Sequence, residues 1–303
     1  MTEPSSLTCR AKGVYRSRVL TNEPICREHG RTVLEVEDFP RASPGQFLQI
    51  LCADACEQGW GGGTFIRRPF SIGGLRRRRR VCELDILYRV IGPGTRWLAH
   101  LQPDDRVSIL GPVGRPFEVK VDRPTAYLVG GGVGLPPLIW LAELLGQADR
   151  QVVAFCGART ADLLPLRLRP GIEPSGETPT LAIEEFAQWG STVVISTDDG
   201  SLGAAGQIPE IFDRYVGRYA DEAVRAAVYT CGPEPMMRAV ARICREHHLP
   251  GQVCLERMMA CGMGTCQSCV VRIRDKGNPQ GWRYQLCCTD GPVFDSQAVI
   301  WED

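Results

Sequence analysis

Three closely spaced cysteines near the C-terminus constrain this chain more than any other feature of its sequence. The nine residues from Cys261 to Cys269 read CGMGTCQSC, a spacing of C-x4-C-x2-C. This is the plant-type ligand run of a [2Fe–2S] cluster, because ferric iron prefers thiolate ligands and such a cluster needs four of them. The small residues in between let backbone N–H groups turn towards the negatively charged sulfides. The sequence therefore predicts a cluster held by Cys261, Cys266 and Cys269.

A fourth ligand is available downstream, at Cys287 or Cys288. The main alternative to an iron–sulfur cluster is a structural zinc site. Zinc loops usually consist of two C-x2-C pairs, whereas here the first pair is stretched and the second is missing. The pattern thus favours the cluster over zinc and over simple buried thiols.

Length, charge and cysteine content bound the class of protein. The chain has 303 residues, which suggests about two domains with room for a small third one. Its 35 basic and 35 acidic residues balance, which argues against nucleic acid as the main partner. No apolar stretch approaches the ~18 residues of a membrane span, and the first residues lack the apolar core of a signal peptide. Fourteen cysteines without an export signal indicate the reducing cytoplasm and metal or redox chemistry.

The first segment, residues 10–121, has the pattern of a small antiparallel β-barrel. Short stretches of alternating apolar and polar residues are separated by Gly and Pro, without intervening helical periods. We expect strands over 31–37, 46–52, 81–90 and 106–112. The glycine-rich stretch 57–65 is expected to form a flexible loop, and the run Arg76–Arg80 a solvated loop between strands rather than a docking patch.

Two motifs in this segment have the chemistry of a flavin dinucleotide site. In Arg68-Pro69-Phe70-Ser71, arginine is a bidentate phosphate donor, serine is a hydroxyl donor, and proline fixes the turn. In Leu87-Tyr88-Arg89, the tyrosine can offer a ring face and a hydroxyl to a flavin. Gly94 and Thr95 then open a helix whose N-terminal amides can hold a pyrophosphate. Taken singly, each motif could also be an ordinary turn or an ordinary helix cap.

The second segment, residues 122–250, alternates strand and helix, as in a parallel sheet with crossover helices. An apolar strand runs into a glycine loop and then into an apolar helix, so the helix N-terminus favours a dinucleotide phosphate. A tight turn without a ligand is the alternative. The glycines of this loop are Gly130, Gly131, Gly132 and Gly134. Further strands are expected over 151–158, 191–200 and 226–231, the last one ending at Cys231-Gly232-Pro233.

Asp198 and Asp199 follow the strand that is expected near the adenosine ribose. Two carboxylates suit the 2′- and 3′-hydroxyls and would repel a 2′-phosphate. The sequence therefore predicts NAD(H) over NADP(H).

The last segment, residues 251–303, adds two short strands, 269–275 and 282–288, to the cysteine loop. About fifty residues cannot bury a large core, so the cluster itself should contribute much of the folding energy there.

In this order the motifs resemble those of the ferredoxin reductase superfamily, and within it the electron-transfer subunits of class 1B dihydroorotate dehydrogenase. The resemblance covers nearly the whole chain, from about Cys9 to Trp301. Its signatures are RPFS, LYR, GPGT, GGGVG, STDDGS, CGPEPMM, LERMMACGMGTCQSC and CTDGPVF. The insertions at 52–66 and 161–180 and the run Arg76–Arg80 depart from the family pattern, without touching the motif residues.

The resemblance implies a multidomain α+β and α/β fold. An N-terminal extension over 1–9 precedes an FAD-binding β-barrel over 10–121, a Rossmann-like NAD-binding domain over 122–250 and a [2Fe–2S] module over 251–303. Arg-Pro-x-Ser would bind the FAD phosphate and ring, and the Gly-Thr pair would close on the pyrophosphate. Cys231 would line the hydride-transfer site without acting as a nucleophile; a buried cysteine at the end of a strand is the alternative. The family's fourth ligand directly precedes the Thr-Asp-Gly-Pro-Val-Phe run, which selects Cys288 over Cys287.

The resemblance also implies a separate catalytic subunit that carries FMN, in a heterotetramer of two subunits of each kind. Dihydroorotate would be oxidised at FMN, and electrons would pass one at a time through the cluster to FAD and leave as hydride to NAD+.

Two alternatives remain. One is an NAD(P)H reductase subunit that passes electrons to an oxygenase, ferredoxin or another redox partner. The CTDGPVFD tail and the STDDGS stretch argue against this alternative. The other is a regulatory or scaffolding relative that binds zinc, which the intact cofactor motifs make unfavourable.

Overall fold

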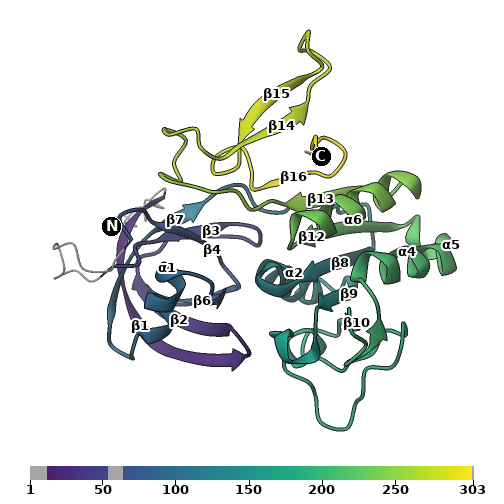
Figure 1. Cartoon of the computed structure of the whole chain (residues 1–303), viewed down its shortest axis with the longest axis horizontal. Coiled ribbons are helices and arrows are strands. Elements are labelled where there is room, and N and C mark those ends of the chain that lie inside the picture. The colour runs from purple at the N-terminus through teal and green to yellow at the C-terminus, as the bar shows by residue number, and fades with distance from the viewer. Residues whose placement is uncertain (1–11, 54–63, 302–303) are drawn as a thin grey trace, which may run out of the picture.

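The computed structural model of the chain describes residues 12–53 and 64–301. These residues form two seven-stranded sheets and one two-stranded sheet (Figure 1). The first sheet comes first in the chain, the second follows, and the hairpin of the third sheet lies between the last two strands of the second. The predicted barrel, α/β fold and small C-terminal sheet are confirmed. Most of the insertion at 52–66 lies outside the described residues.

The first sheet is antiparallel throughout, in the order β4-β3-β7-β1-β2-β6-β5. Its interior consists of alternate apolar residues, among them Leu34, Leu84 and Ile86, which are fully buried. Helix α1 (Pro93–His100) follows β6 and contributes Leu98 to this core. The strands are β1 (Gly13–Cys26), β2 (His29–Glu37), β3 (Phe47–Ile50), β4 (Arg68–Ser71), β5 (Gly74–Arg78), β6 (Val81–Arg89) and β7 (Arg106–Val113).

The arginine run does not form the expected loop. Arg76, Arg77 and Arg78 lie in β5, an edge strand of the first sheet, and Arg76 is opposite Glu83 of β6. All three arginines are exposed. Charged side chains on an exposed edge strand hinder pairing with other chains, so a run that has no apolar alternation can still be a strand there.

The second sheet has the order β11-β10-β9-β8-β12-β13-β16, and every strand except β16 is parallel to its neighbours. Its strands are apolar on both faces because helices cover both. Helices α2 (Leu135–Gln147) and α3 (Glu184–Ala187) pack on one face, and α4 (Ile208–Arg218), α5 (Ala220–Ala223) and α6 (Glu234–Glu246) on the other. The strands are β8 (Thr125–Gly131), β9 (Gln151–Ala158), β10 (Thr192–Thr197), β11 (Ala204–Ala205), β12 (Ala226–Cys231), β13 (Gly251–Cys254) and β16 (Val293–Asp295).

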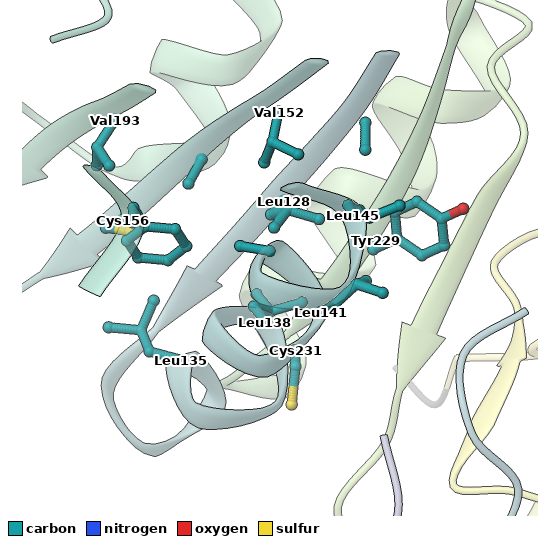
Figure 2. Packing of buried hydrophobic residues seen from close by; sticks show 14 of the residues in the cluster. Leu128, Leu135, Leu138, Leu141, Leu145, Val152, Cys156, Val193, Tyr229 and Cys231 are labelled. Carbon is teal, nitrogen blue, oxygen red and sulfur yellow. The ribbon is translucent and has the colours of Figure 1, made fainter. Parts of the chain in front are cut away.

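Helix α2 anchors this sheet (Figure 2). Its leucines Leu138, Leu141 and Leu145 point onto the central strands and meet Leu128 of β8 and Tyr229 of β12. All of these side chains are at most 2% exposed. Burial of each leucine contributes about 1.5–3 kcal/mol relative to leaving it in water, which holds the helix and the loop before it in a fixed position on the sheet.

The third sheet is the hairpin of β14 (Val270–Arg274) and β15 (Trp282–Leu286), which projects from the body of the molecule (Figure 1). The boundary expected at residue 250 cuts through the second sheet, because β13 and β16 both belong to it. The two strands pair with partners far away in sequence, which local patterns do not reveal. In the described part of the chain, no helix combines the length and apolarity that crossing a membrane requires.

Candidate functional site

The two flavin-type motifs of the barrel lie against each other. Arg68 begins β4, and Gly94 lies in the first turn of α1. A Cβ atom on Gly94 would come within 3.4 Å of the Arg68 Cγ atom, so the arginine stem passes directly over the helix N-terminus. The first amides of a helix have no acceptor within the helix. A guanidinium and a helix N-terminus next to each other are suited to a pyrophosphate.

Thr95 closes the turn in front of this helix. Its Oγ1 atom accepts hydrogen bonds from the Ile91 amide at 2.9 Å and the Gly92 amide at 3.1 Å, and it donates one to the Gly92 carbonyl. The hydroxyl is thereby used within the chain. Its contribution to a phosphate site is to fix the turn, while the amides of the first helical turn are left to bind the ligand.

Tyr88 has a different environment from the one expected. It is only 3% exposed, and its hydroxyl donates a hydrogen bond to Asn22 Oδ1 at 2.9 Å. The Asn22 amide in turn donates to the carbonyls of Leu98 and Leu101, at the end of α1. The ring covers Gly30, its partner across the strand pair, where an added Cβ atom would come within 2.5 Å of the hydroxyl. Tyr88 therefore supports the helix from inside the barrel and does not offer its ring face to a ligand.

The neighbours of Tyr88 have other surroundings. Leu87 lines a crevice between the barrel and the second sheet, together with Gly73 and Pro136. The Arg89 guanidinium binds Glu28 Oε2 through Nε at 2.9 Å and Nη2 at 2.6 Å. This contact is the main cause of a lowered pKa of Glu28.

The glycine loop and the Cys-Gly-Pro turn meet at one edge of the second sheet. Strands β8 and β12 are adjacent, with Gly130 opposite Cys231. A Cβ atom on Gly134 would lie 2.3 Å from the Cys231 carbonyl oxygen, so no larger residue fits there. Gly132 has φ +54° and open space around it. The strand order reverses between β8 and β12, and ligands of open α/β sheets bind at the carboxyl ends of the strands at such a point.

Cys231 is buried at this edge, at 7% exposure, and lies below α2 (Figure 2). It is in register with Cys254 of the neighbouring strand β13. A hydrogen bond between the two thiols, together with burial, raises the pKa of Cys254 well above its usual range. Cys231 thus lies buried at the edge where the glycine loop ends, and its role in lining a hydride-transfer site stays a prediction.

The two aspartates after β10 differ in their contacts. Asp199 Oδ1 accepts hydrogen bonds from the Ser201 hydroxyl at 2.6 Å and the Ser201 amide at 3.0 Å, which lower the pKa of the aspartate. Asp198 is exposed, and no other described residue pairs with its carboxylate. Of these two aspartates, Asp198 is thus the one whose carboxylate has no partner among the described residues.

The insertion at 161–180 forms one wall of a hollow beside these aspartates. The hollow measures about 780 Å³ and is lined by 168–174, except 170, on one side and by Gly200–Gly203 on the other. A volume of this order is typical of small-molecule sites. Sequence patterns gave no indication that the insertion folds back onto the loop after β10.

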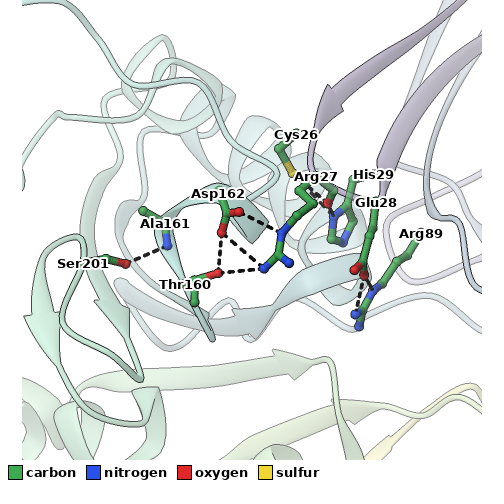
Figure 3. Close-up of polar contacts among 9 residues, drawn as sticks. All are labelled: Cys26, Arg27, Glu28, His29, Arg89, Thr160, Ala161, Asp162 and Ser201. Atoms are coloured by element: carbon green, nitrogen blue, oxygen red, sulfur yellow. Dashed lines mark hydrogen bonds and ion pairs between the residues drawn. The ribbon is translucent and has the colours of Figure 1, made fainter.

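A set of polar contacts connects the barrel with this loop (Figure 3). At the tip of the β1–β2 hairpin, Arg27 Nε lies 2.7 Å from Asp162 Oδ2, and the Arg27 amide donates to the Asp162 carbonyl at 3.0 Å. The Ala161 amide donates to Ser201 Oγ at 2.8 Å, and Ser201 holds Asp199. Arg27 and Asp162 belong to no sequence motif, because residues so far apart along the chain share no local signal.

The cysteine loop is arranged as expected for sulfur ligands. The amides of Met263 and Cys266 both donate to Cys261 Sγ, each at 3.4 Å. Cys266 is exposed, and its Sγ atom lies 3.2 Å from Ser268 Oγ. The hydrogen bond from this hydroxyl is the main cause that lowers the pKa of Cys266 to about 6. A thiolate is the form that binds metal, so the loop favours the ligand state.

Cys287 and Cys288 point to different neighbours. Cys288 is buried, and its thiol interacts with the Cys269 thiol and with the Gly264 amide. Burial and the contact with Cys269 raise the pKa of Cys288 to about 12. The Cys287 thiol instead donates to the Leu255 carbonyl at 3.3 Å. The chain therefore brings Cys288 to the same side as the ligand run.

The residues fit an iron–sulfur cluster. Such a cluster is held by thiolates and takes amide hydrogen bonds to its sulfurs. Three cysteines in one loop with Cys288 beside them, and amides turned towards sulfur, match that donor set.

Comparisons with known proteins agree with this arrangement. Residues 256–300 match the iron–sulfur cluster binding domain of dihydroorotate dehydrogenase B. The chain is 36% identical over 290 residues to the dihydroorotate dehydrogenase B (NAD(+)) electron transfer subunit of Desulforamulus reducens, covering 95% of this chain and 99% of the relative. It is 32% identical to the subunit of the same name from Caldanaerobacter subterraneus subsp. tengcongensis, covering 94% and 98%.

Solved structures show the same fold. An NADH-dependent reduced ferredoxin-NADP oxidoreductase superposes with a TM-score of 0.73 at 24% identity, covering 94% of this chain and 90% of that chain. The Amycolatopsis cytochrome P450 reductase GcoB gives a TM-score of 0.59 at 22% identity, covering 78% and 67%. At these identities the likeness extends to the reductase fold alone.

Proposed function

The chain belongs to the family of electron transfer subunits of NAD-dependent dihydroorotate dehydrogenase B, and from this membership we propose which of its residues perform the transfer. It is an oxidoreductase subunit of pyrimidine biosynthesis. The observation that supports the assignment most strongly is the cysteine loop with Cys288 beside it, in one chain with a reductase-type barrel and nucleotide edge. Free thiols at every described cysteine fit a reducing compartment such as the cytosol.

FAD binds where the two barrel motifs meet. Arg68 and the first-turn amides at Gly94 and Thr95 would hold its pyrophosphate, and Pro69, Phe70 and Ser71 would complete the site along β4. Leu87 and Arg89 contribute from β6, Arg89 through its pairing with Glu28. Tyr88 acts on the flavin only by supporting α1.

NAD+ binds at the carboxyl edge of the second sheet. The glycine loop takes the pyrophosphate, Cys231 with Gly232 and Pro233 lies beside the nicotinamide, and Asp198 accepts hydrogen bonds from the ribose hydroxyls. A free carboxylate opposes the 2′-phosphate of NADP(H), so the expected acceptor is NAD+.

Cys261, Cys266, Cys269 and Cys288 are the proposed ligands of the [2Fe–2S] cluster. When bound, the cluster supplies one-electron transfer and FAD joins it to the two-electron chemistry of NAD+. The chain's own residues hold these groups in order. The amides on Cys261 and the hydroxyl on Cys266 stabilise negative charge at sulfur.

The catalytic partner subunit docks over the cluster loop. Met258 is 90% exposed and Met263 50%, on either side of Cys261, and Tyr284 of the hairpin is 61% exposed. Exposed methionines and tyrosines are typical of interface cores. The proposed partner carries FMN and oxidises dihydroorotate, and the proposed assembly is a heterotetramer of two subunits of each kind.

Anaerobic purification tests this function. The chain is prepared alone and co-expressed with the candidate catalytic subunit of its organism, and NAD+ reduction by dihydroorotate is measured. Activity in the co-expressed sample alone is the expected result. A preparation that contains flavin and cluster and reduces dyes with NADH, but forms no complex and shows no dihydroorotate activity, would instead favour a reductase for an oxygenase or ferredoxin.

A further inference from the structure

Gln49 is a polar residue in an entirely buried position between the flavin and the cluster parts of the molecule. It lies in β3, whose four residues are all buried, and it is itself 0% exposed. Across the sheet it is opposite Pro69 of the flavin motif in β4 and opposite Leu110 in β7. Its carbonyl oxygen accepts a hydrogen bond from Arg67 Nη1 at 3.3 Å. The backbone of Gln49 is thus part of the strand pair that begins the flavin motif.

The side chain of Gln49 reaches the cluster loop. Its Nε2 atom donates to Met259 Sδ at 3.6 Å. A Cβ atom on Gly262 would lie 2.6 Å from Nε2 and 2.7 Å from Cγ of Gln49. Gly262 follows Cys261 and has φ +67°, in the region that favours glycine. The carboxamide therefore lies directly against the loop backbone, one residue from a proposed ligand.

The carboxamide oxygen of Gln49 has no hydrogen-bond partner among the described residues. Buried polar atoms in native proteins are almost always paired, and replacing such a side chain by an apolar one normally favours stability when no pairing is gained. A glutamine at this point is therefore poorly explained by packing alone. Its position between Pro69 and Gly262 points to a role in joining the two redox sites.

We propose that Gln49 is a positioning residue for electron transfer between the cluster and FAD. Its carboxamide fixes the cluster loop at Gly262 against the strand pair of Pro69, and it supplies hydrogen-bonding capacity next to the ligand Cys261. Hydrogen bonds and solvent exclusion around the sulfurs set the reduction potential of an iron–sulfur cluster. The inference rests on the proposed function, because it requires both groups to be bound.

Gln49→Met tests this role in the holoprotein, because methionine keeps the length of the side chain and removes the amide. We expect a changed electron paramagnetic resonance spectrum of the reduced cluster and a shifted midpoint potential. We also expect cluster reduction by NADH to slow by about tenfold, the order found for outer-shell partners of metal sites. Flavin reduction by NADH should keep its rate.

Ser17→Ala is the matched control, because Ser17 is a buried polar residue of the same sheet whose hydroxyl binds the Val107 carbonyl at 2.9 Å. It should lower the melting temperature and leave the cluster spectrum unchanged. A wild-type spectrum, potential and rate of cluster reduction in Gln49→Met would overturn the proposal. Wild-type protein that binds neither flavin nor cluster would instead overturn the proposed function.

A second pair of variants decides the matter if Gln49→Met loses its cluster. Gly262→Ala places a methyl group against the carboxamide and should reduce cluster content. Gly264→Ala is its control, because Gly264 lies in the same loop and also has a positive φ of +93°, but a Cβ atom there would meet Thr289 at 3.2 Å and not Gln49. An equal loss of cluster in the two variants would show that the contact with Gln49 does not position the loop.

Discussion

Neighbouring residues with the same side chain have different surroundings at two places in this molecule. Cys287 binds the backbone of Leu255, whereas Cys288 faces Cys269. Asp199 is held by Ser201, whereas Asp198 is exposed. The residues of each pair lie side by side in the chain, so substitutions within a pair control for general effects on folding.

Cys288→Ser should lose the cluster and keep FAD, because a serine hydroxyl is a hard, protonated group in place of a thiolate. Cys287→Ser should keep both groups. Iron and labile sulfide per subunit and the flavin released on denaturation measure the outcome. If Cys287→Ser loses the cluster and Cys288→Ser retains it, the ligand assignment is off by one residue.

Asp198→Asn should weaken the preference for NADH over NADPH. Removing a carboxylate from the ribose site relieves repulsion of a 2′-phosphate, and a change of about 1.4 kcal/mol alters the ratio of the two kcat/KM values about tenfold. Asp199→Asn should change this ratio less, because Ser201 already binds that carboxylate. Wild-type protein that uses NADPH as efficiently as NADH would contradict the assignment.

Arg68→Ala should lower FAD retention by about tenfold or more, since a charge-assisted hydrogen bond to phosphate contributes about 1.5–3 kcal/mol. Arg78→Ala is the control, because Arg78 is exposed on β5, at the opposite edge of the same sheet. The dissociation constant of FAD is measured by fluorescence of the released flavin. Equal flavin affinity in both variants would argue against Arg68 as the phosphate ligand.

At the scale of single elements, α1 depends on a residue inside the barrel. Tyr88 binds Asn22, and Asn22 binds the last carbonyls of the helix. The helix has only eight residues and would be marginal by itself. Its N-terminus is the proposed pyrophosphate site, so a contact at the far end of the helix affects where the phosphate is held.

Tyr88→Phe should lower the free energy of unfolding by about 1 kcal/mol, the usual loss for one buried hydrogen bond, and should weaken FAD binding without touching the ligand. A double-mutant cycle with Asn22→Ala tests the pair. An interaction energy of about 0.5 kcal/mol or more is expected for residues in one network. Additive effects would mean that the two side chains support α1 independently.

Local signals predicted those elements whose pattern is set by neighbours in sequence. The strands β2, β6 and β7 and the glycine loop before α2 follow alternation or a glycine run, and all four form where expected. The strand β5 has no such alternation, because it is an edge strand whose three arginines are all exposed. The local pattern around Tyr88 predicts a residue that faces the flavin, because nothing in it reveals that Gly30, on another strand, lets the ring be buried.

At the scale of the whole molecule, contacts between distant segments could not be predicted from local sequence patterns. The strands β13 and β16 extend the second sheet beyond the expected boundary at residue 250. The pair Arg27 and Asp162 joins the barrel to the loop of the adenosine site, and Gln49 joins the barrel to the cluster loop. Each contact brings together residues with no shared motif, so only the assembled fold reveals it.

Arg27→Ala should raise KM for NADH several-fold and leave stability nearly unchanged. The Arg27 and Asp162 side chains are 52% and 60% exposed, and exposed ion pairs contribute at most about 1 kcal/mol. The effect on KM is expected because Asp162 follows Ala161, whose amide binds Ser201, and Ser201 binds Asp199. Asp199 directly follows Asp198, the proposed ribose ligand, so a shift of this loop would move that carboxylate. NADH-dependent dye reduction and a melting curve measure both quantities. A lower melting temperature with unchanged KM would limit the contact to a structural role.

The core beneath the cysteine loop is shared with the barrel. Phe47, Leu110 and Val113 of the barrel strands pack with Cys269 and Cys288 in one buried cluster. We therefore expect a chain whose barrel is unfolded to retain iron and sulfide poorly. For the same reason, residues 256–300 are not expected to hold the cluster when they are moved into another protein. Grafted onto another reductase, they would carry every ligand but lack the side chains against which the ligands pack.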